Sequence, residues 1–564
     1  MSLVNSMRRR LLTGLWPEQR QQCTTIRKTL LTGCWLVVLC PSLFGAPFSS
    51  NLPIIVLDTH GQVIRNASSI VAEMGIIDNG RGAINRSTDP FNDYHGKIAI
   101  EIRGSSGQWQ KWPKEQYGFE TQDDAGANRN VSLLGLPPEN DWILYPPYSD
   151  KSLIRNVLAY RLSRDIGRYA PRTRFCELVL NGDYRGVYVL VEKIKRDKNR
   201  VNIAKLQSED LSGDALTGGY IVKVDRRAGE VNEGWLSPYR FSDKGDVEWL
   251  YHHPKPSQLT PEQREYIKTY VIEFERLMAR SDWEREYERF FDVEAFIDYF
   301  LLNELYNNID TYTFSTFFYK DRDSKGGRLT IGPVWDINLG FGNANYFVGM
   351  ETEGWLLGKK IEVRDRIPFW LKNLFESRNV RERTAHRWAQ LRKNELTDAR
   401  LFEFIDACAD TLAEAQKRNF ERWPILGQYI WPNVVRYDTW EQEIDYLKDW
   451  LIKRTQWMDR QLLPMASTAA DPEYEFVLLG NFPNPFNAAT AIAFELADAG
   501  HVSLAIFDLN GRRAALLIDQ WYSAGRHQVM WDGSDHGRPL AGGLYFYRII
   551  FKKHSQQKCM LLLR

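Results

Sequence analysis

Apolar residues recur along this chain with different spacings in different regions, and the spacing predicts where strands and helices lie. Short apolar runs separated by Gly-rich turns predict strands over 53–58, 98–103 and 117–121. The stretch over 364–463 instead has a largely helical pattern that is rich in Arg and Trp. The larger part of the chain is therefore expected to mix strands and helices.

The first clear helical pattern begins near Asp150. Asp150 is placed to cap the start of this helix, and Gly167 stands where it would stop. Its apolar stripe consists of Leu153, Ile154, Val157, Leu158 and Leu162. Two strands are expected next, over 175–180 and 184–191, and the Asn-Gly pair between them is a strong signal for a tight hairpin turn.

A second helix is expected from Asp292, and it ends just before Asp310. Its inner face consists of Phe296, Ile297, Phe300, Leu301 and Leu305. Two β-rich segments then follow over 311–331, joined by a charged, Gly-containing turn, and Asp336 comes directly after them.

An acid after a helix and a second acid after a hairpin form the layout of kinase-type phosphoryl transfer. One carboxylate orients the attacking hydroxyl, and the other holds Mg²⁺ against the nucleotide phosphates. Spacing alone leaves an alternative open. Because Asp is common in turns, Asp310 can be a capping residue and Asp336 an ordinary loop acid.

The pattern changes again towards the C-terminus. Residues 464–475 are small and polar, as in a linker. Beyond them Val502, Leu504 and Ile506 recur at every second position, as do Leu544 and Phe546. Turn signals stand at Asn510-Gly511 and Asp532-Gly533. This predicts a small all-β sandwich over 476–564, within the usual size of a domain.

Composition narrows the possible partners. The chain has 564 residues, so more than one domain is expected. Lys plus Arg number 73 against 72 Asp plus Glu, a balance that does not point to nucleic acid or an anionic membrane. The 19 Trp, 26 Tyr and 28 Phe suit large cores, with sugar- or peptide-binding surfaces as the alternative.

The N-terminal segment is typical of an export signal. Arg27 and Lys28 precede an apolar run over 30–40, and small residues follow near Ala46. Residues 1–46 are therefore expected to form a signal segment, with the true start downstream of Met1. Cys40 raises a lipoprotein alternative, although the residues before it are larger than such signals usually show. The mature protein is expected to be secreted or held at the cell surface, without a transmembrane helix.

The cysteine and histidine patterns argue against a disulfide-stabilised protein and against a zinc hydrolase. Cys176, Cys408 and Cys559 would remain after export, and their wide spacing predicts neither a disulfide framework nor a metal site. Cys176 is expected to be a buried strand residue. No HExxH motif is present, which argues against a zinc hydrolase.

Longer motifs add a family resemblance. Residues 332–343 read GPVWDINLGFGN, which resembles the GP-[IV]-WD-x-[DN]-x-x-FGN signature of the CotH kinase family of atypical protein kinases. Further matches over roughly 52–460 include EIRGSSGQWQKWPKEQYGFE, LVLNGDYRGVYVLVEKIK and FDVEAFIDYFLLNELYNNID. The resemblance implies an α+β fold with an atypical protein-kinase-like domain over 52–463. It also implies ATP with Mg²⁺ or Mn²⁺ as cofactors.

The resemblance gives roles to residues around the two acids. Asp310 would be the catalytic base, and Asp336 would bind the metal. The family's second metal-binding acid is replaced by Asn338, and Ser315 stands where protein kinases use an Asn ligand. Both remain oxygen donors that Mg²⁺ accepts, but the two replacements leave open whether this member is active.

Other residues would contact the nucleotide. Arg103, Gly104 and Gly107 lie in the turn expected over the phosphates, where glycines allow close approach of backbone N–H groups. Lys114 opens the following strand and is the candidate for a phosphate-contacting, catalytic lysine. The alternative is that Lys114 is a surface lysine.

The helix after Asp150 departs from the protein-kinase pattern, since no glutamate is placed to pair with that lysine. Arg155 is therefore a candidate for contacting the phosphates, and Asn156 for orienting them. Glu192 follows the strand over 187–191, where a hinge would meet the adenine. A purely structural role for Glu192 is the alternative.

The C-terminal region has a second resemblance. Its segments LLGNFPNPFNAATAIAFEL and GGLYFYRI, with the closing residues 558–564, resemble the FlgD-like immunoglobulin fold and the C-terminal sorting domain of type IX secretion substrates. This implies the secretion machinery as a partner. The alternative is a generic adhesion-like sandwich.

Three functions follow from these patterns. The first is a secreted kinase that phosphorylates Ser or Thr of envelope or extracellular proteins. The second is a catalytically silent surface-assembly or adhesion protein that keeps the fold. The third is a carbohydrate-active hydrolase, which would need its two carboxylates at a defined separation.

Overall fold

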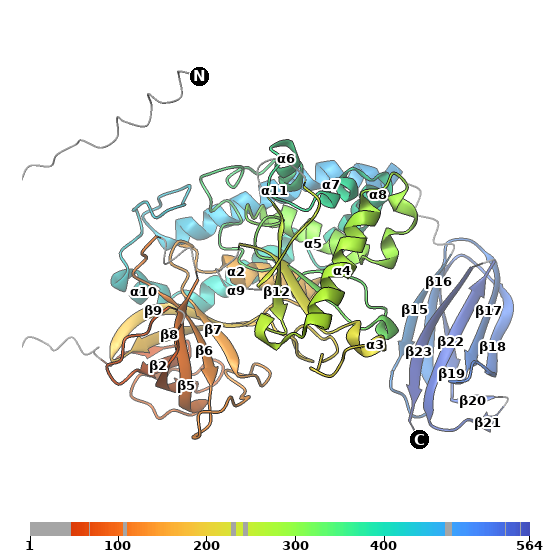
Figure 1. Ribbon diagram of the computed structural model, residues 1–564, viewed down its shortest axis with the longest axis horizontal. Helices are drawn as coiled ribbons and strands as arrows, with labels where there is room; N and C mark the ends of the chain where they lie inside the picture. Colours follow the sequence, from red (N-terminus) through yellow and green to blue (C-terminus); the bar gives the residue numbers. More distant parts are fainter. Residues whose placement is uncertain are drawn as a thin grey trace, which may run out of the picture. The chain divides into compact units, whose positions relative to one another are not determined.

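The computed structural model shows a mixed α and β protein, as predicted (Figure 1). It describes residues 47–66, 68–104, 110–226, 233–240, 246–468, 476–535, 537–552 and 554–563. The expected signal segment and Gly107 lie outside these residues, as does the part of the expected linker over 469–475.

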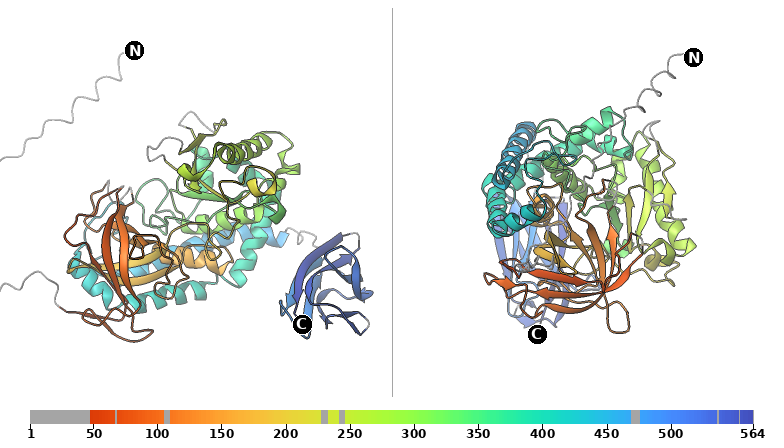
Figure 2. Two further views of the ribbon diagram at one scale, coloured as in Figure 1. Left: turned by 60° about the horizontal axis from the view of Figure 1, so that its bottom comes forward. Right: turned by 90° about the vertical axis from the view of Figure 1, so that its left-hand side faces the viewer.

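The first part of the fold is a closed barrel, drawn in red and orange in Figures 1 and 2. Its strands are β2 (Ile54–Asp58), β3 (Ile70–Ile77), β5 (Tyr94–Arg103), β6 (Gln116–Thr121), β7 (Asp141–Tyr145), β8 (Thr173–Leu180) and β9 (Asp183–Glu192). They follow the order β2-β3-β5-β6-β7-β9-β8, and parallel pairing of β2 with β8 closes the ring. A short pair, β1 (Ser49–Ser50) with β4 (Asn85–Arg86), lies outside the ring. The predicted strands are confirmed.

Alternate residues of the barrel strands point inwards and form one apolar core. This core contains Ile55, Leu57, Met74, Ile98, Ile100, Tyr117, Phe119 and Leu190. Cys176 on β8 is buried in it, as expected. The β8–β9 hairpin turns at Asn181 and Gly182, whose φ values of 51° and 80° suit the left-handed turn that the sequence predicts.

Helix α2 (Arg155–Asp165) is enclosed on nearly all sides. It begins later than predicted, because Asp150 does not occupy the N-cap position. The Asp150 carboxylate instead accepts the backbone N–H of Arg155 at 2.9 Å and pairs with its guanidinium at 2.6 Å. The predicted apolar stripe is buried, and so are Arg155, Asn156 and Tyr160 on the remaining sides.

The second part of the fold is built on a five-stranded antiparallel sheet with the order β11-β12-β10-β13-β14. Its strands are β10 (Tyr220–Val224), β11 (Gly234–Leu236), β12 (Glu248–His253), β13 (Thr316–Lys320) and β14 (Thr330–Ile331). Strands β13 and β14 form the hairpin predicted between Asp310 and Asp336, with Phe318 opposite Ile331.

Helices cover this sheet and extend beyond it (Figure 1). They are α3 (Gly213–Leu216), α4 (Pro261–Met278), α5 (Val293–Tyr306), α6 (Leu356–Glu362), α7 (Trp370–Glu376), α8 (Arg378–Lys393), α9 (Asp398–Leu412), α10 (Ala415–Arg422) and α11 (Trp440–Thr468). The Asp292 carboxylate caps α5 by accepting the N–H of Ala295 at 3.1 Å, as predicted. Helix α11 continues past residue 463 into the segment predicted as a linker.

Much of the tryptophan content serves the core of this part. Trp249, Trp370, Trp388 and Trp450 are among the largest fully buried side chains. Their burial supports the core interpretation of the high aromatic content.

The C-terminal region over 476–563 is all-β, with two antiparallel sheets that share one core. One sheet contains β15 (Phe476–Phe482), β16 (Thr490–Leu496) and β19 (Gly525–Trp531); the other contains β17 (Gly500–Phe507), β18 (Arg513–Tyr522), β22 (Gly543–Phe551) and β23 (His554–Leu562). A small pair joins β20 (Ser534–Asp535) to β21 (Arg538–Pro539). Val502, Leu504 and Ile506 face the core, as expected.

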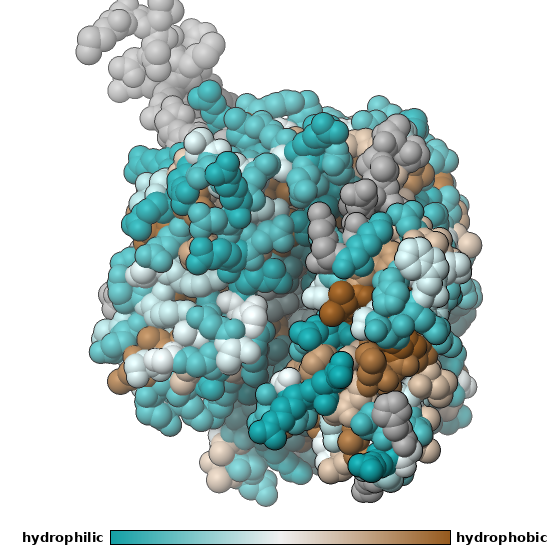
Figure 3. All heavy atoms as spheres, turned by 90° about the vertical axis from the view of Figure 1, so that its right-hand side faces the viewer, coloured by the Kyte–Doolittle hydropathy of each residue, from teal (hydrophilic) through white to brown (hydrophobic). Residues whose placement is uncertain are grey.

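Strand β22 places its apolar residues on both faces. Tyr545 and Tyr547 belong to the core, whereas Leu544 is exposed and Phe546 is half-buried. Trp521 and Met530 are also exposed, by 71% and 65%. Figure 3 shows apolar side chains gathered within an otherwise hydrophilic surface.

Two expectations concern cysteines and membranes. Cys176 and Cys408 are buried and Cys559 is exposed, and these three are unpaired in the part of the chain that the structure describes. Among the described residues, no helix combines the length and the apolar character needed to cross a bilayer.

A buried carboxyl in the second part of the fold gives a test of the packing. Glu275 on α4 is fully buried and accepts hydrogen bonds from Ser237 Oγ at 2.8 Å and Trp249 Nε1 at 3.2 Å. Burial raises the pKa of Glu275 to about 7 from an ordinary value of 4.5. The folded protein therefore binds more protons than the unfolded chain between these pH values, so this contribution to stability is lost as the pH rises through 7.

We predict that Glu275→Gln increases the free energy of unfolding relative to the native protein at pH 8 but much less at pH 5. The difference between the two pH values should reach about 3 kcal/mol at most. Urea unfolding followed by tryptophan fluorescence measures it, with the exposed Glu265→Gln on the same helix as the control. An equal effect of Glu275→Gln at both pH values would show that this carboxyl is not held protonated.

Candidate active site

The structure brings Asp310 and Asp336 into one electrostatic cluster. Burial, and after it the nearby carboxylates of Asp310 and Asp225, raise the pKa of Asp336 to about 7, against the lowering effect of Arg103. Burial also raises the pKa of Asp310. Two acids from separate loops therefore lie close enough for the Asp310 carboxylate to oppose the ionisation of Asp336.

Helix α5 delivers Asp310 through a well-tethered turn. The helix ends at Asn307, which is left-handed with φ 47°, and its side-chain amide donates to the carbonyls of Val348 and Glu351. The Asn308 amide then donates to Thr311 Oγ1 at 3.0 Å and to the Asp336 carbonyl at 3.2 Å. Asn308 thus ties the Asp310 turn directly to the Asp336 loop.

Helix α2 holds the Asp336 loop from the other side. The N–H of Asp336 donates to the Tyr160 hydroxyl at 3.3 Å, and the N–H of Ile337 donates to Asn156 Oδ1 at 2.8 Å. The Trp335 ring stacks on Tyr160. Asp336 itself has a left-handed φ of 58°, which is uncommon for a non-glycine residue and fits a position fixed by its surroundings.

Arg103 reaches the same cluster from the end of β5. Its guanidinium is partly buried, and burial lowers its pKa while the carboxylates of Asp141, Glu101 and Asp336 raise it. Gly104 follows with a left-handed φ of 85°, a conformation that glycine adopts without a steric penalty. The turn predicted over the phosphates therefore begins beside Asp336.

The candidate metal ligands other than Asp336 lie on the connected loops. Asn338 is partly buried, and its carbonyl accepts the Asn343 side-chain amide at 2.8 Å. Ser315 is partly buried with a left-handed φ of 50°.

A divalent cation fits this donor set. Asp336, Asn338 and Ser315 offer hard oxygen donors, and the raised pKa of Asp336 shows that its ionised form lacks sufficient positive charge nearby. Among the described residues, no three His, Cys, Asp or Glu side chains are grouped so that they alone could hold a metal ion. Mg²⁺ commonly uses one or two protein carboxylates and completes its shell with phosphate and water oxygens.

Asn156 is close to the cluster, but its contact differs from the one expected. Its side-chain oxygen is used by the backbone of Ile337, and the residue is 5% exposed. Asn156 therefore orients the Asp336 loop through the backbone of Ile337, and the orienting role expected for it at the phosphates stays a prediction.

Lys114 lies in a different environment from the expected one. Its ammonium is buried and donates to the Val187 carbonyl at 2.6 Å and to Asn419 Oδ1 at 2.7 Å. Burial lowers its pKa well below the ordinary value. Through these contacts Lys114 joins β9 to α10. Lys114 is therefore not a surface lysine, and no contact of its ammonium group supports the predicted binding of phosphate.

Arg155 and Glu192 are also engaged by structural partners. Arg155 is fully buried and pairs with Asp150 at 2.6 Å. Glu192 is fully buried, pairs with Arg172 at 2.7 Å and accepts the backbone N–H of the same residue at 2.9 Å. This supports the structural alternative for Glu192.

Two residues of the cluster were not recognised from the sequence. Asp225 follows β10, and the pairing of Val224 with Thr316 places it beside Ser315 across the sheet. Lys360 on α6 is a cation close enough to lower the pKa of Asp310. Asp225 directly follows the largely apolar strand residues 220–224, which is a usable signal, but nothing local distinguishes Lys360 from other helical lysines.

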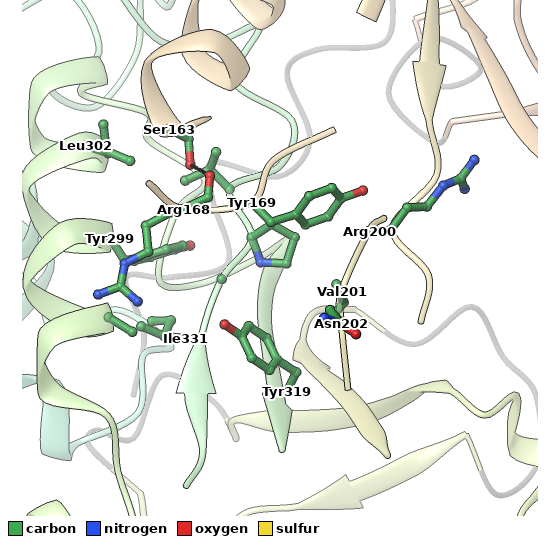
Figure 4. A pocket seen from close by; sticks show the side chains of 14 residues that line it. Ser163, Arg168, Tyr169, Arg200, Val201, Asn202, Tyr299, Leu302, Tyr319 and Ile331 are labelled. Atoms are coloured by element: carbon green, nitrogen blue, oxygen red, sulfur yellow. Dashed lines mark hydrogen bonds between the residues drawn. The ribbon is translucent and has the colours of Figure 1, made fainter. Parts of the chain in front are cut away.

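Two cavities lie near these loops. One of about 290 Å³ adjoins the Asp310 turn, and its lining includes Asp225, Arg226, Thr313, Phe314 and Arg366. The other, of about 200 Å³, adjoins Gly332, Pro333 and Val334, and its lining includes Tyr169, Tyr299 and Tyr319. Figure 4 shows the rings of Tyr169 and Tyr319 facing this second space, with Val201 and Asn202 beside it.

Comparison with known families agrees with this geometry. Residues 100–458 match the family described as CotH kinase protein, which is more than half of the chain. The chain therefore belongs to the CotH kinase family. A search of curated proteins found no match.

The contact of Asn156 provides a test of how the acid loop is held. We predict that Asn156→Ala lowers the free energy of unfolding by about 1–3 kcal/mol, because the buried N–H of Ile337 loses its acceptor. The exposed Asn394→Ala at the end of α8 is the control and should change stability by less than about 0.5 kcal/mol. Denaturant unfolding measures the free energy of unfolding of both variants. Equal values for Asn156→Ala and Asn394→Ala would show that Asn156 does not stabilise the Asp336 loop.

Proposed function

We propose that this protein is a secreted or cell-surface kinase that transfers phosphate from ATP to Ser or Thr of envelope or extracellular proteins. Membership of the CotH kinase family supports a kinase-like protein. The observation that carries the proposal furthest is the joining of Asp310 and Asp336 in one cluster, through the Asn308 bridge and the effect of the Asp310 carboxylate on the pKa of Asp336.

The two acids differ in ways that suit different roles. Asp310 has Lys360 and Arg226 nearby, both of which lower its pKa against the effect of burial. In its ionised form this carboxylate can orient the acceptor hydroxyl and take its proton. Asp336 has a raised pKa and lies beside Asn338, which suits a position that binds a cation.

Mg²⁺ or Mn²⁺, when bound with ATP, supplies positive charge to the transferring phosphoryl group. Asp336, Asn338 and Ser315 would hold the metal. Arg103 and the backbone after Gly104 would contact the phosphates, since they reach the cluster from the barrel. Asn156 and Tyr160 would keep the Asp336 loop in place while the nucleotide binds.

A catalytically silent surface-assembly protein is the second candidate. The neutral residues Asn338 and Ser315 at two expected metal positions favour it. This candidate predicts the same fold and no transfer of phosphate.

The proposal gives a contrast between the two acids. We predict that Asp310→Asn reduces turnover by about 10²- to 10⁴-fold with little change in ATP affinity, because it removes base assistance but no ligand. Asp336→Ala should abolish metal-dependent phosphorylation while the protein still folds. Incorporation of labelled phosphate, together with nucleotide binding by calorimetry, measures both effects.

Two results would contradict this assignment. Full activity in folded Asp336→Ala would remove Asp336 from the mechanism. Loss of ATP affinity with retained turnover in Asp310→Asn would show that the two acids have the opposite roles.

The C-terminal region would direct delivery of the protein to the cell surface and take no part in phosphoryl transfer. None of its described residues belongs to the acid cluster, and its two sheets enclose their own core. Exposed apolar residues such as Trp521 and Met530 give it a surface suited to a protein partner. We propose that it is an immunoglobulin-like sorting domain recognised by secretion machinery, and that the N-terminal segment directs export.

Truncation of the chain tests this role of the C-terminal region in delivery. We predict that a chain ending near Asp471 folds, keeps any phosphotransfer activity and crosses the inner membrane, but fails to reach the surface. Fractionation of full-length and truncated protein in the native host, or in a type IX-competent one, measures delivery. Unchanged surface delivery of the truncated chain would contradict the sorting role and would indicate that the C-terminal region is only a binding module.

A further inference from the structure

Two neighbouring lysines on α6 occupy opposite environments. The Lys359 side chain is 42% exposed and pairs with Glu362 on the same helix. The Lys360 side chain is 3% exposed and points into the protein. Burying an ammonium group costs free energy unless the group is paired. The buried position of Lys360 therefore needs an explanation, whereas the exposed position of Lys359 does not.

Lys360 belongs to a closed set of three hydrogen bonds. Its Nζ donates to Thr313 Oγ1 at 2.8 Å and to Asp365 Oδ2 at 2.7 Å, and Thr313 Oγ1 donates to Asp365 Oδ2 at 3.0 Å. These bonds join α6 and the residues after it to the turn that follows α5. That turn carries Asp310.

Thr313 connects this set to Asp310. The N–H of Thr313 donates to the Asp310 carbonyl at 3.2 Å, so Lys360 is one residue removed from the acid. The next N–H along the chain, that of Phe314, donates to the same carbonyl at 2.8 Å. Fixing the Thr313 side chain therefore restrains the backbone on which Asp310 stands.

The charges around Asp310 are unevenly balanced. The cations that face it are Lys360 and Arg226, and the acids are Asp225, Asp365 and Asp336, with the Tyr346 hydroxyl also nearby. Arg226 is an exposed residue whose guanidinium lies over the Phe314 ring, whereas Lys360 is buried and fixed by two hydrogen bonds. Removing Lys360 would leave Arg226 as the remaining cation in this set.

We propose that Lys360 is a positioning residue of the phosphoryl-transfer site. It holds the Asp310 turn through Thr313 and keeps a fixed positive charge beside the Asp310 carboxylate. This inference rests on the proposed kinase function, because only a reaction that uses Asp310 requires its turn and its charge to be held.

Three variants separate this role from simple packing. Lys360→Met removes the charge and both hydrogen bonds but keeps an unbranched side chain, whereas Lys360→Arg keeps the charge. Lys359→Met removes the exposed neighbour from the same helix and is the matched control. Each is expressed as the full chain, and a thermal melt identifies any variant that does not fold.

Kinetics provide the first readout. Lys360→Met is expected to lower kcat by about 10- to 100-fold with little change in KM for ATP, because the base is displaced while the nucleotide site is retained. The acidic limb of the kcat–pH profile should move to higher pH, since loss of a neighbouring cation raises the pKa of Asp310. Lys360→Arg should restore most of the rate, and Lys359→Met should match the native protein.

Hydrogen exchange provides a second readout that does not depend on activity. The peptide over 307–316 should exchange faster in Lys360→Met than in the native protein or Lys359→Met, because the turn has lost its anchor. Unchanged exchange would overturn the positioning role, even in an inactive protein.

The outcomes distinguish the inference from the proposed function. Native protein that transfers no phosphate contradicts the kinase function, whereas an active native protein with unchanged kinetics in Lys360→Met contradicts the role of Lys360 alone. Equal loss of rate in the Met and Arg variants, without a shift of the pH profile, would also overturn the proposal.

Discussion

The mutual repulsion of Asp310 and Asp336 is the constraint on which the rest of the site depends. The Asp310 carboxylate opposes ionisation of Asp336, and Asp225 opposes ionisation of both acids. A protein gains no stability from such an arrangement, so the loops must be held by contacts elsewhere. Asn308 joins the two loops, and the hydrogen bonds from α2 fix the second of them.

Positive charge reaches this cluster from separate parts of the fold. Arg103 comes from the barrel, Lys360 from α6 and Arg226 from the end of β10. The pKa of Asp336 is nevertheless raised to about 7, because burial and the carboxylates of Asp310 and Asp225 outweigh the effect of Arg103. The remaining deficit is what a divalent metal would supply, and this connects the electrostatics of the cluster to the kinase chemistry of the family.

Local signals were sufficient for part of this description. The hairpin at Asn181, the helix capped by Asp292 and the loops that carry both acids follow from residues close together in the sequence. The environments of Lys114 and Lys360 did not follow, because their partners are far along the chain. Lys114 bonds to Asn419, 305 residues away, and Lys360 bonds to Thr313, 47 residues away. A one-dimensional pattern contains no information on such pairings until the tertiary fold is known.

The account is tested most directly by calorimetric titration of the full chain with a non-hydrolysable ATP analogue, with Mg²⁺ present and with the metal chelated. It predicts binding in Mg²⁺ that is lost on chelation and lost in Asp336→Asn, which keeps the shape of the side chain but removes its charge. Absence of binding, or equal binding with and without the metal and in Asp336→Asn, would contradict the assignment of Asp336 to a metal–nucleotide site.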